Sequence, residues 1–434
     1  MENGDLIKVF LTDKSEKEGV LMPSHDKNVL ILKLKNGYNI GLKKTKIKKI
    51  ETIKKNLSKE IKIKEQQINK SLMNILILHT GGTISSRVSY ITGAVSSITK
   101  PEELIQQIPE LKDIVNISSK LIKNMFSDDL RFKHFQEIGE SINKEIKKYD
   151  GIIIGMGTDN LAVAACALSF ILENPQIPIL LVGSQRSSDR GSSDATLNLI
   201  SACYFIANSN FKGVAICMHE SSEDTSCLIL SATKTKKLHS SRRDAFKIIN
   251  DKPIARINYK NNEVKFFKHK ENYPREYKFK PKMEEKVALL KIHVNMQSEQ
   301  FLLYKNYKGL VLEGTGLGHA PINETDKPTK IHKKIYLALK ELSKNTVIVM
   351  TSNTIFGRIN MNVYDTGRRL QEIGIISGED MLPETALIKL SWLLANEKNP
   401  KELITKNLRG EINSRIEYEE DFLDQQKTIK FDKI

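Results

Sequence analysis

The sequence is poor in cysteine and tryptophan and contains no long apolar run. Its 434 residues include four cysteines and one tryptophan, and no two cysteines show the C-x-x-C spacing that is typical of zinc and redox sites. Three of the four cysteines lie in apolar runs, where cysteine is usually a small buried hydrophobic residue. We therefore expect a reducing compartment, no disulfide framework and no cysteine-based zinc site.

Signals for membrane insertion or export are also missing. No apolar run approaches the roughly 20 residues that span a bilayer, and the chain does not open with a basic, apolar and small-residue cleavage pattern. We therefore expect a cytoplasmic protein without membrane contact. With 40% hydrophobic residues over 434 positions, the chain is long and apolar enough for more than one globular domain.

Acidic residues are too few to balance the basic ones. Lys and Arg number 68 against 52 Asp and Glu, which gives a net charge of +16. Residues 1–70 alone contain 17 lysines, no arginine and nine acidic residues, a net charge of +8. Such an excess favours a polyanionic partner such as RNA, or it simply keeps the protein soluble.

The N-terminal segment shows the pattern of short strands. "DLIKVFL" and "KNVLILKLKNGYNIGL" alternate or cluster aliphatic residues, and Asn36-Gly37 is a strong hairpin-turn signal. These features predict a small SH3-like β-barrel over residues 1–50. The charged segment 51–71, which is poor in aromatic residues, is predicted to be a linker with some helix.

The rest of the chain alternates short aliphatic runs with helical stretches. The runs are too short for helices and too uniformly apolar for half-exposed strands, so they suit strands buried on both faces. They lie at 74–79, 151–155, 177–183, 213–218, 309–314 and 346–351. With helices expected at 160–174 and 193–208, the pattern predicts an α/β fold with a doubly wound parallel sheet. We expect one lobe at 72–267, a charged linker at 268–285 and a second lobe at 286–434.

Polar residues follow the first three aliphatic runs, at the points where the strands should end. Hydroxyl groups, glycines and carboxylates occupy residues 80–83, 157–160 and 183–189. Because ligands bind at the carboxyl ends of the strands in open parallel sheets, we expect the functional site at these three loops.

The glycine pair Gly81-Gly82 does not belong to a known phosphate-binding motif. "HTGGTISSRV" has no lysine after the glycines and no helical pattern, so it matches neither a P-loop nor a dinucleotide fingerprint. The two glycines permit a tight turn and a close approach of backbone to a ligand. Such a turn suits a carbonyl oxygen as well as a phosphate, and a glycine pair is more often a turn than a site.

Thr158 and Asp159 stand at a strand-to-helix junction, where two uses are open. Threonine, aspartate and asparagine all cap helix N-termini, and capping is the commoner use. Alternatively, a hydroxyl group beside a carboxylate can be activated if a base lies nearby.

Five cations gather in the segment 231–246, namely Lys234, Lys236, Lys237, Arg242 and Arg243. Such a run is usually a solvated or anion-binding surface. A lysine packed among other cations also loses its proton more easily and can then accept one, but the pattern does not tell which lysine turns inward. His79, His239 and His319 are isolated in the sequence, so no metal site is expected.

Four separated motifs resemble, in content and order, the bacterial-type L-asparaginase family. They are "TGGTI" at 80–84, "GTD" at 157–159, "GSQR" at 183–186, and Lys237, nine residues before the Phe of "DAF". Longer segments are similar to one branch of this family, the D subunits of archaeal-type glutamyl-tRNA(Gln) amidotransferases. They include "GSQRSSDRGSSDATLNL", "KLHSSRRDAF", "EGTGLGHAP" and "TSNTIFGRINMNVYDTGRRL". The N-terminal module also resembles this branch, whereas plain asparaginases lack it. Two residues depart from the common family pattern, Met156 in place of His and Asn160 in place of Thr.

The resemblance implies an asparaginase-like fold and an activity that releases ammonia from an amide donor, chiefly glutamine. In this branch, a partner called the E subunit uses the ammonia, together with ATP and Mg, to convert Glu-tRNA(Gln) to Gln-tRNA(Gln). This chain is therefore expected to need no cofactor of its own. It is expected to form a homodimer within a heterotetramer and to meet tRNA(Gln) through that complex.

The resemblance also implies the site residues. Four residues are expected to be catalytic: Thr83 as the nucleophile, with Thr158, Asp159 and Lys237. Tyr90, in a lid after the nucleophile, is expected to assist. The expected substrate-binding residues are Ser127, Asp128, Gly82 and Gly157.

Two other functions remain open at this point. One is a free L-asparaginase that carries an extra barrel, and the other is a non-catalytic basic scaffold for RNA. The N-terminal module favours the role in the amidotransferase over the first alternative, and the intact threonine, aspartate and lysine set argues against the second.

Overall fold

A computed structural model describes residues 2–24, 26–35, 38–55, 68–82, 108–186, 192–268 and 276–416, together with the short strands β7 (Ser86–Val88) and β8 (Val95–Ser97), which pair with each other. The predicted turn at Asn36-Gly37 and most of the predicted linker 51–71 lie outside these residues.

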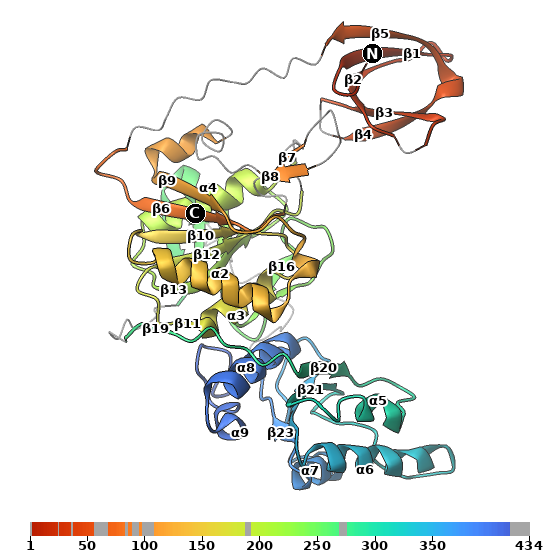
Figure 1. Ribbon diagram of the computed structural model, residues 1–434, viewed down its shortest axis with the longest axis vertical. Coiled ribbons are helices and arrows are strands. Elements are labelled where there is room, and N and C mark those ends of the chain that lie inside the picture. The colour runs from red at the N-terminus through yellow and green to blue at the C-terminus, as the bar shows by residue number, and fades with distance from the viewer. Residues whose placement is uncertain are drawn as a thin grey trace, which may run out of the picture.

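The N-terminal segment forms a five-stranded antiparallel sheet that curls into a small barrel (Figure 1). Its strand order is β4-β3-β2-β1-β5. Alternate residues point inward, as the period of two requires, and Ile7, Val9 and Leu32 are fully buried. The strands are β1 (Leu6–Leu11), β2 (Glu16–Met22), β3 (Val29–Lys33), β4 (Asn39–Lys43) and β5 (Ile47–Lys54), with the 3-10 turn η1 (Lys44–Lys46) before β5. Strand β5 thus continues past residue 50, where the module was predicted to end.

The first lobe is built on an eight-stranded sheet with the order β18-β17-β14-β13-β12-β10-β6-β9. Its strands are β6 (Asn74–His79), β9 (Asn116–Leu121), β10 (Gly151–Gly155), β12 (Pro178–Val182), β13 (Gly213–His219), β14 (Cys227–Ser231), β17 (Ala255–Asn258) and β18 (Glu263–Phe266). Strands β9, β6, β10, β12 and β13 are parallel, and the last three strands extend the sheet in antiparallel pairs. The predicted parallel sheet is confirmed, and the antiparallel extension was not predicted.

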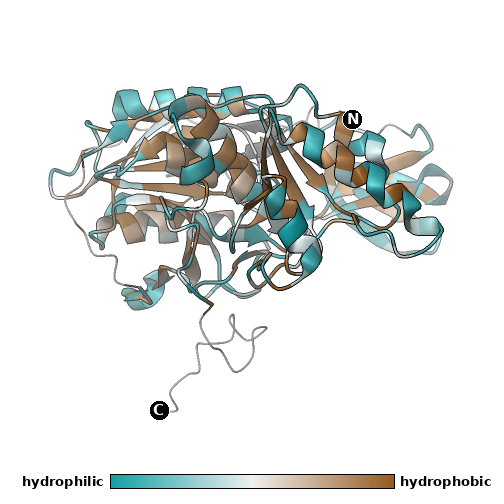
Figure 2. Ribbon diagram, turned by 90° about the horizontal axis from the view of Figure 1, so that it is seen from below, coloured by the Kyte–Doolittle hydropathy of each residue, from teal (hydrophilic) through white to brown (hydrophobic). Residues whose placement is uncertain are grey.

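Helices cover both faces of this sheet because its central strands are apolar on both sides. Every residue of β10 and β12 is buried, and Figure 2 shows the apolar strands between helices whose outer faces are hydrophilic. The helices are α2 (Phe132–Glu145), α3 (Leu161–Ile171) and α4 (Ala195–Ala207). Shorter elements complete the lobe: η2 (Pro109–Asp113), η3 (Ser127–Asp129), η4 (Tyr259–Asn261) and the hairpin β15 (Thr235–Lys237) with β16 (Phe246–Ile248).

The second lobe is a four-stranded parallel sheet with the order β20-β21-β22-β23. Its strands are β20 (Val287–Lys291), β21 (Gly309–Gly314), β22 (Val347–Ser352) and β23 (Ile376–Ser377). Its helical elements are α5 (Ser298–Leu302), η5 (Pro328–Ile331), α6 (His332–Leu342), α7 (Asp365–Glu372), α8 (Pro383–Asn396) and α9 (Pro400–Leu403). Within the predicted second linker, β19 (Lys278–Phe279) pairs with β11 (Leu172–Glu173) of the first lobe.

The two lobes share one apolar core, in which α3 packs against α8 (Figure 1). Nearly every side chain of α3 is buried, since one side faces the first sheet and the other faces α8. Phe170 of α3 lies 5.6 Å from Trp392 of α8, measured between ring centroids. No helix within the described ranges is both long and apolar enough to cross a membrane.

Candidate active site

The first two polar loops lie side by side because their strands are neighbours. Strands β6 and β10 pair in parallel, with Gly155 opposite His79. The chain after β6 stays close to β10, since the backbone N–H of Thr80 donates a hydrogen bond of 3.0 Å to the carbonyl oxygen of Gly155. The Thr80 hydroxyl donates to the same oxygen at 3.2 Å. The loops with "TGG" and "GTD" therefore begin at the same edge of the sheet.

Three of the predicted binding residues lie in direct contact at this edge. Gly82 has φ = +85°, and a Cβ atom added there would lie 2.4 Å from the backbone nitrogen of Gly157. A Cβ atom added to Gly157 would in turn lie 2.9 Å from the Ser127 hydroxyl oxygen. Glycine at 82 and 157 thus permits the close approach of three loops.

The predicted lysine reaches this edge from a different element. Lys237, on β15, donates hydrogen bonds of 3.0 Å to Thr158 Oγ1 and 2.7 Å to Asp159 Oδ1. The Lys237 side chain is 15% exposed and that of Asp159 is 64% exposed. The half-buried lysine side chain therefore contacts the threonine hydroxyl, while the Asp159 carboxylate remains exposed.

Thr158 is not a helix cap, although capping is the commoner use of threonine at such a junction. The N-cap of α3 is Asn160, and its side chain makes no capping hydrogen bond. The Thr158 hydroxyl instead accepts a hydrogen bond from Lys237. The sequence-based preference for capping is therefore wrong for Thr158.

Ser127 and Asp128 lie on η3, next to the "GTD" loop. Ser127 is buried, whereas Asp128 is exposed. Asn160 ties the two loops together, because its side-chain nitrogen donates to the Ser127 carbonyl oxygen at 2.8 Å and its backbone nitrogen to the Ser127 hydroxyl at 3.4 Å. Asn160, which stands in place of the threonine common in the family, thus links η3 to the "GTD" loop.

Two predicted residues, Thr83 and Tyr90, lie outside the described part of the chain. Thr83 follows directly after Gly82, whose backbone contacts Gly157. The roles of Thr83 as nucleophile and of Tyr90 as lid residue therefore remain predictions.

The structure also shows which lysine faces the site. Lys237 contacts Thr158 and Asp159 in the first lobe, whereas Lys234 and Lys236 form ion pairs with Asp380 and Glu384 of the second lobe. Lys237 is thus the lysine beside Thr158 and Asp159, whereas Lys234 is the most deeply buried of the three; the catalytic role of Lys237 stays a prediction.

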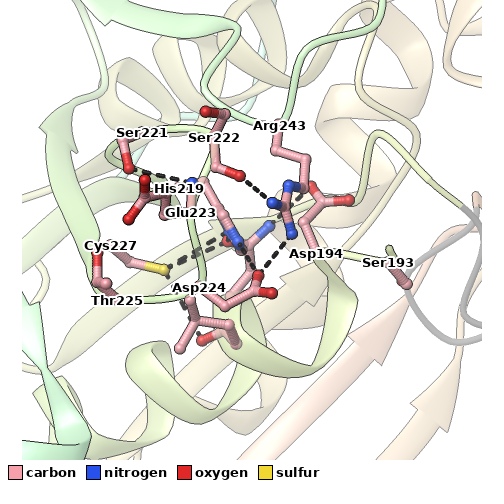
Figure 3. Close-up of polar contacts among 12 residues, drawn as sticks. Ser193, Asp194, His219, Ser221, Ser222, Glu223, Asp224, Thr225, Cys227 and Arg243 are labelled. Carbon is pink, nitrogen blue, oxygen red and sulfur yellow. Dashed lines mark hydrogen bonds and ion pairs between the residues drawn. The ribbon is translucent and has the colours of Figure 1, made fainter. Parts of the chain in front are cut away.

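A buried polar network lies next to the "GSQR" loop, which follows strand β12 (Figure 3). The sequence patterns did not predict it. Asp194 is fully buried at the start of α4 and accepts hydrogen bonds of 3.0 Å from the backbone nitrogens of Gln185 and Arg186. The side chain of Asn198 donates to Asp194 at 3.2 Å, and its Oδ1 lies 2.6 Å from Nδ1 of His219. The network therefore orders the "GSQR" loop.

One feature of the sequence could have revealed this network. Asp194 and Asn198 are four residues apart and so lie on one face of a helix that is otherwise apolar.

The network ends at the surface, where His219 Nε2 lies 3.1 Å from Asp224 and Arg243 pairs with the same carboxylate at 2.6 Å. Burial lowers the pKa of His219, but Cys227 and Asp224 raise it, and the net result lies above the ordinary value.

The described residues offer no cluster of metal ligands. Within these ranges, no group of three or more His, Cys, Asp or Glu residues could hold a metal ion. All four cysteines are free and buried.

Burial of His79, the last residue of β6, makes the stability of the fold sensitive to acid. Burial lowers the pKa of His79 from 6.5 to about 4. Between these values the histidine is neutral in the folded protein and protonated in the unfolded chain, so stability is lost as the pH falls from 6.5 to about 4. We expect this titration to cost about 3 kcal/mol of unfolding free energy. Urea denaturation at several pH values should show a smaller loss for His79→Gln, and parallel curves for the two proteins would contradict the assignment.

Gly82→Ala tests the close contact between the first two loops. The positive φ costs roughly 1–3 kcal/mol for a residue with a side chain, and the new methyl group would collide with the backbone of Gly157. We expect the catalytic activity to fall about 100-fold, since small displacements of reacting groups have effects of this size. Gly374→Ala is the matched control, because Gly374 has φ = +91° but open space around its Cβ position. Equal losses of activity in the two variants would show that backbone strain alone, and not the contact, is responsible.

Comparison with known proteins assigns this fold to a class. Residues 74–272 match the family model "Asparaginase, N-terminal", residues 286–405 match "Glutaminase/Asparaginase C-terminal domain" and residues 1–53 match "GatD N-terminal domain". The structure is similar to that of the thermostable L-asparaginase from Thermococcus kodakarensis, with a TM-score of 0.71, 29% identity, and coverage of 79% of this chain and 99% of that one. The main body is thus an asparaginase-family amidohydrolase domain.

The curated relatives narrow the class further. The chain is 43% identical over 431 residues to the D subunit of glutamyl-tRNA(Gln) amidotransferase from Methanococcus maripaludis, covering 96% of this chain and 100% of the relative. It is 42% identical to the corresponding protein of Pyrococcus furiosus, with 95% of each chain covered. The chain belongs to the family of D subunits of glutamyl-tRNA(Gln) amidotransferases, which confirms the resemblance inferred from the motifs.

Proposed function

We propose that this chain hydrolyses glutamine and supplies the ammonia with which a partner subunit converts Glu-tRNA(Gln) to Gln-tRNA(Gln). The observation that carries the proposal is the contact of Lys237 with Thr158 and Asp159, beside the junction of Gly82 and Gly157. The near-full-length relatives, each named as the D subunit of such an amidotransferase, support the tRNA-linked role.

The proposed chemistry begins at Thr83. A threonine hydroxyl is a weak nucleophile until a base removes its proton, and Lys237 with Thr158 provides a relay for that proton. The Thr83 oxygen forms a bond to the amide carbon, and the resulting oxyanion is stabilised by backbone N–H groups of the glycine turn at Gly82. Tyr90 assists from the lid.

The intermediate then collapses to release ammonia. The carbon–nitrogen bond breaks, the proton taken from Thr83 passes to the leaving nitrogen, and an acyl ester remains on Thr83. Water cleaves this ester and yields glutamate. These steps are carried by side chains and backbone groups of this chain, so we assign the use of ATP and Mg to the partner subunit.

The substrate is held by groups around the same edge. The Asp159 carboxylate is exposed beside Lys237 and orients the substrate ammonium group. Ser127, which lies against Gly157, and Asp128, the next residue of η3, bind the α-amino and α-carboxylate groups. Gly82 and Gly157 allow the substrate-binding loops to meet closely, because neither carries a side chain.

A free L-asparaginase is the second candidate, favoured by the similarity to solved L-asparaginases. The similarity covers almost the whole of those enzymes but only 79% of this chain. About a fifth of this chain therefore has no counterpart in them. Residues 1–53 match the domain model "GatD N-terminal domain", which supports the amidotransferase role. A non-catalytic RNA scaffold would have no use for the contact between Lys237 and Thr158.

Reconstitution tests the proposal. The chain should be mixed with its partner, the amidotransferase E subunit, and with Glu-tRNA(Gln), ATP, Mg and glutamine, and Gln-tRNA(Gln) should form. If no Gln-tRNA(Gln) forms while the isolated chain hydrolyses asparagine rapidly, the free asparaginase is the correct function. The molecular mass of the complex in the same mixture tests whether the chain forms a homodimer within a heterotetramer.

Since its proposed substrate complex contains tRNA, we place the protein in the cytoplasm.

A further inference from the structure

Lys237 lies on a small hairpin that is separate from the main sheet. Strands β15 and β16 pair with each other, with Lys237 opposite Phe246. Two backbone hydrogen bonds extend the pairing, from Leu238 to Ala245 at 2.7 Å and from Ile249 to Lys234 at 2.8 Å. The position of the Lys237 ammonium group therefore depends on where this hairpin is held.

The lysines of this segment point in two directions. Side chains alternate along an extended strand, so Lys234 and Lys236 share one face and Lys237 lies on the other. On the first face, Lys234 Nζ lies 2.6 Å from Asp380 Oδ2, with side chains 2% and 3% exposed. Lys236 pairs with Glu384, in the first turn of α8. Two lysines thus contact the second lobe while the third contacts Thr158 and Asp159.

Neutral hydrogen bonds attach both ends of the hairpin to the second lobe. Before β15, the carbonyl oxygen of Thr233 accepts a hydrogen bond of 2.8 Å from the Thr385 hydroxyl. After β16, the side chain of Asn250 donates to the Gly357 carbonyl oxygen and accepts from the Gly357 backbone nitrogen, both at 2.9 Å. Asn413 donates to the Asn250 carbonyl oxygen at 2.6 Å.

Asp380 is itself held in place. Its second carboxylate oxygen accepts a hydrogen bond of 3.0 Å from the backbone nitrogen of Asn413. A buried ion pair with its remaining oxygen satisfied has one favourable geometry, because any separation leaves a charge without a partner in a low-dielectric interior. The pair of Lys234 and Asp380 therefore sets a defined distance between the hairpin and the second lobe.

We propose that Asp380 and Glu384 are positioning residues for the active site. They hold Lys234 and Lys236, and through the hairpin they place the Lys237 ammonium group at Thr158 and Asp159. The second lobe thereby acts on catalysis without touching the substrate. This inference rests on the function proposed above, in which Lys237 takes part in proton transfer.

The test uses the full-length chain and compares two buried ion pairs, one between the lobes and one within the second lobe. Asp380→Asn keeps the shape of the side chain but removes the charge that pairs with Lys234. We expect kcat for amide hydrolysis to fall about 100-fold, as for a displaced catalytic group. We expect KM to change less than about threefold, because the substrate-binding residues stay in place.

Lys389→Met is the matched control. Lys389 lies on α8, 2.7 Å from Glu411, and both side chains are fully buried. Its other hydrogen bonds go to the carbonyl oxygens of Ile404 and Lys406. This variant should lose stability comparably, yet keep kcat within about twofold of the unchanged protein, since it removes no hairpin contact. Asp380→Glu should recover part of the lost kcat by restoring the charge.

Several results would overturn the proposal. It is wrong if Asp380→Asn keeps full kcat, or if Lys389→Met lowers kcat to the same extent. If Asp380→Asn does not fold, Glu384→Gln replaces it, because its ion pair is partly exposed, and full kcat in that variant also refutes the proposal. The unchanged protein is measured first with glutamine and with asparagine. Its failure with both amides would refute the proposed function, whereas the ratio of variant to unchanged protein tests the positioning role.

Discussion

Thr83→Val is expected to abolish glutamine-dependent formation of Gln-tRNA(Gln) while ammonium-dependent formation continues. Valine has the shape of threonine but lacks the hydroxyl group, so the proposed nucleophile is lost and the fold is kept. We expect the glutamine-dependent rate to fall by about 10³-fold or more, the effect typical of nucleophile removal. The measurement is Gln-tRNA(Gln) formation by the complex with either glutamine or ammonium chloride as nitrogen donor.

Thr80→Val provides the matched control, three residues earlier in the same loop. The Thr80 hydroxyl donates to the Gly155 carbonyl oxygen at 3.2 Å, and its loss should cost about 1 kcal/mol of stability and little activity. Loss of both the glutamine-dependent and the ammonium-dependent reaction in Thr83→Val would show that the site or the division of labour between the two partners is assigned incorrectly.

Lys237→Met is expected to have the second-largest effect. The side chain keeps much of its volume but loses the ammonium group that contacts Thr158 and Asp159. Removing a group that transfers a proton costs roughly 10² to 10⁴ in rate, and we expect a loss of glutamine hydrolysis within that range. Ammonium-dependent transamidation by the complex should persist, because the proposed division of labour assigns that step to the partner subunit.

The control for this variant lies on the same hairpin. Lys247 is 17% exposed, close to the 15% of Lys237, and it pairs with Asp244 and donates to the carbonyl oxygen of Glu220. Lys247→Met should therefore keep glutamine hydrolysis within about threefold of the unchanged protein. If Lys237→Met retained activity and Lys234→Met lost it, the catalytic lysine would be Lys234, and the positioning role of Asp380 would have to be abandoned.

The fold was predictable where hydrophobicity has a clear period. The six aliphatic runs all became buried strands of the two sheets, because strands covered by helices on both faces need apolar side chains at every position. The antiparallel strands β14, β17 and β18 were missed, as were the parallel strands β9, β20 and β23. "ARIN" and "EVKF" carry charged residues, and only the place of β17 beside β14 and of β18 beside β17 gives them hydrogen-bond partners in a sheet.

The candidate site was only partly predictable. The order of glycine, hydroxyl and carboxylate groups after β6 and β10 follows from the sequence, and adjacent parallel strands bring such loops together. The buried network of Asp194 and Asn198 was missed, since a polar residue at the start of a helix is read first as a cap. Its partner His219 lies at the end of β13, more than 20 residues away in the chain.

The sequence by itself determined the two-lobed α/β architecture, the small N-terminal barrel and the kinds of residue at the strand ends, because these depend on local pattern and on the spacing of motifs. The tertiary structure decided which way each lysine of the β15 hairpin points. That choice depends on Asp380 and Glu384, more than 140 residues further along the chain. Their carboxylates pair with Lys234 and Lys236. Lys237, on the opposite face of the strand, contacts Thr158 and Asp159. A buried charge is stable only beside its partner, and which partner is near is a property of the folded chain.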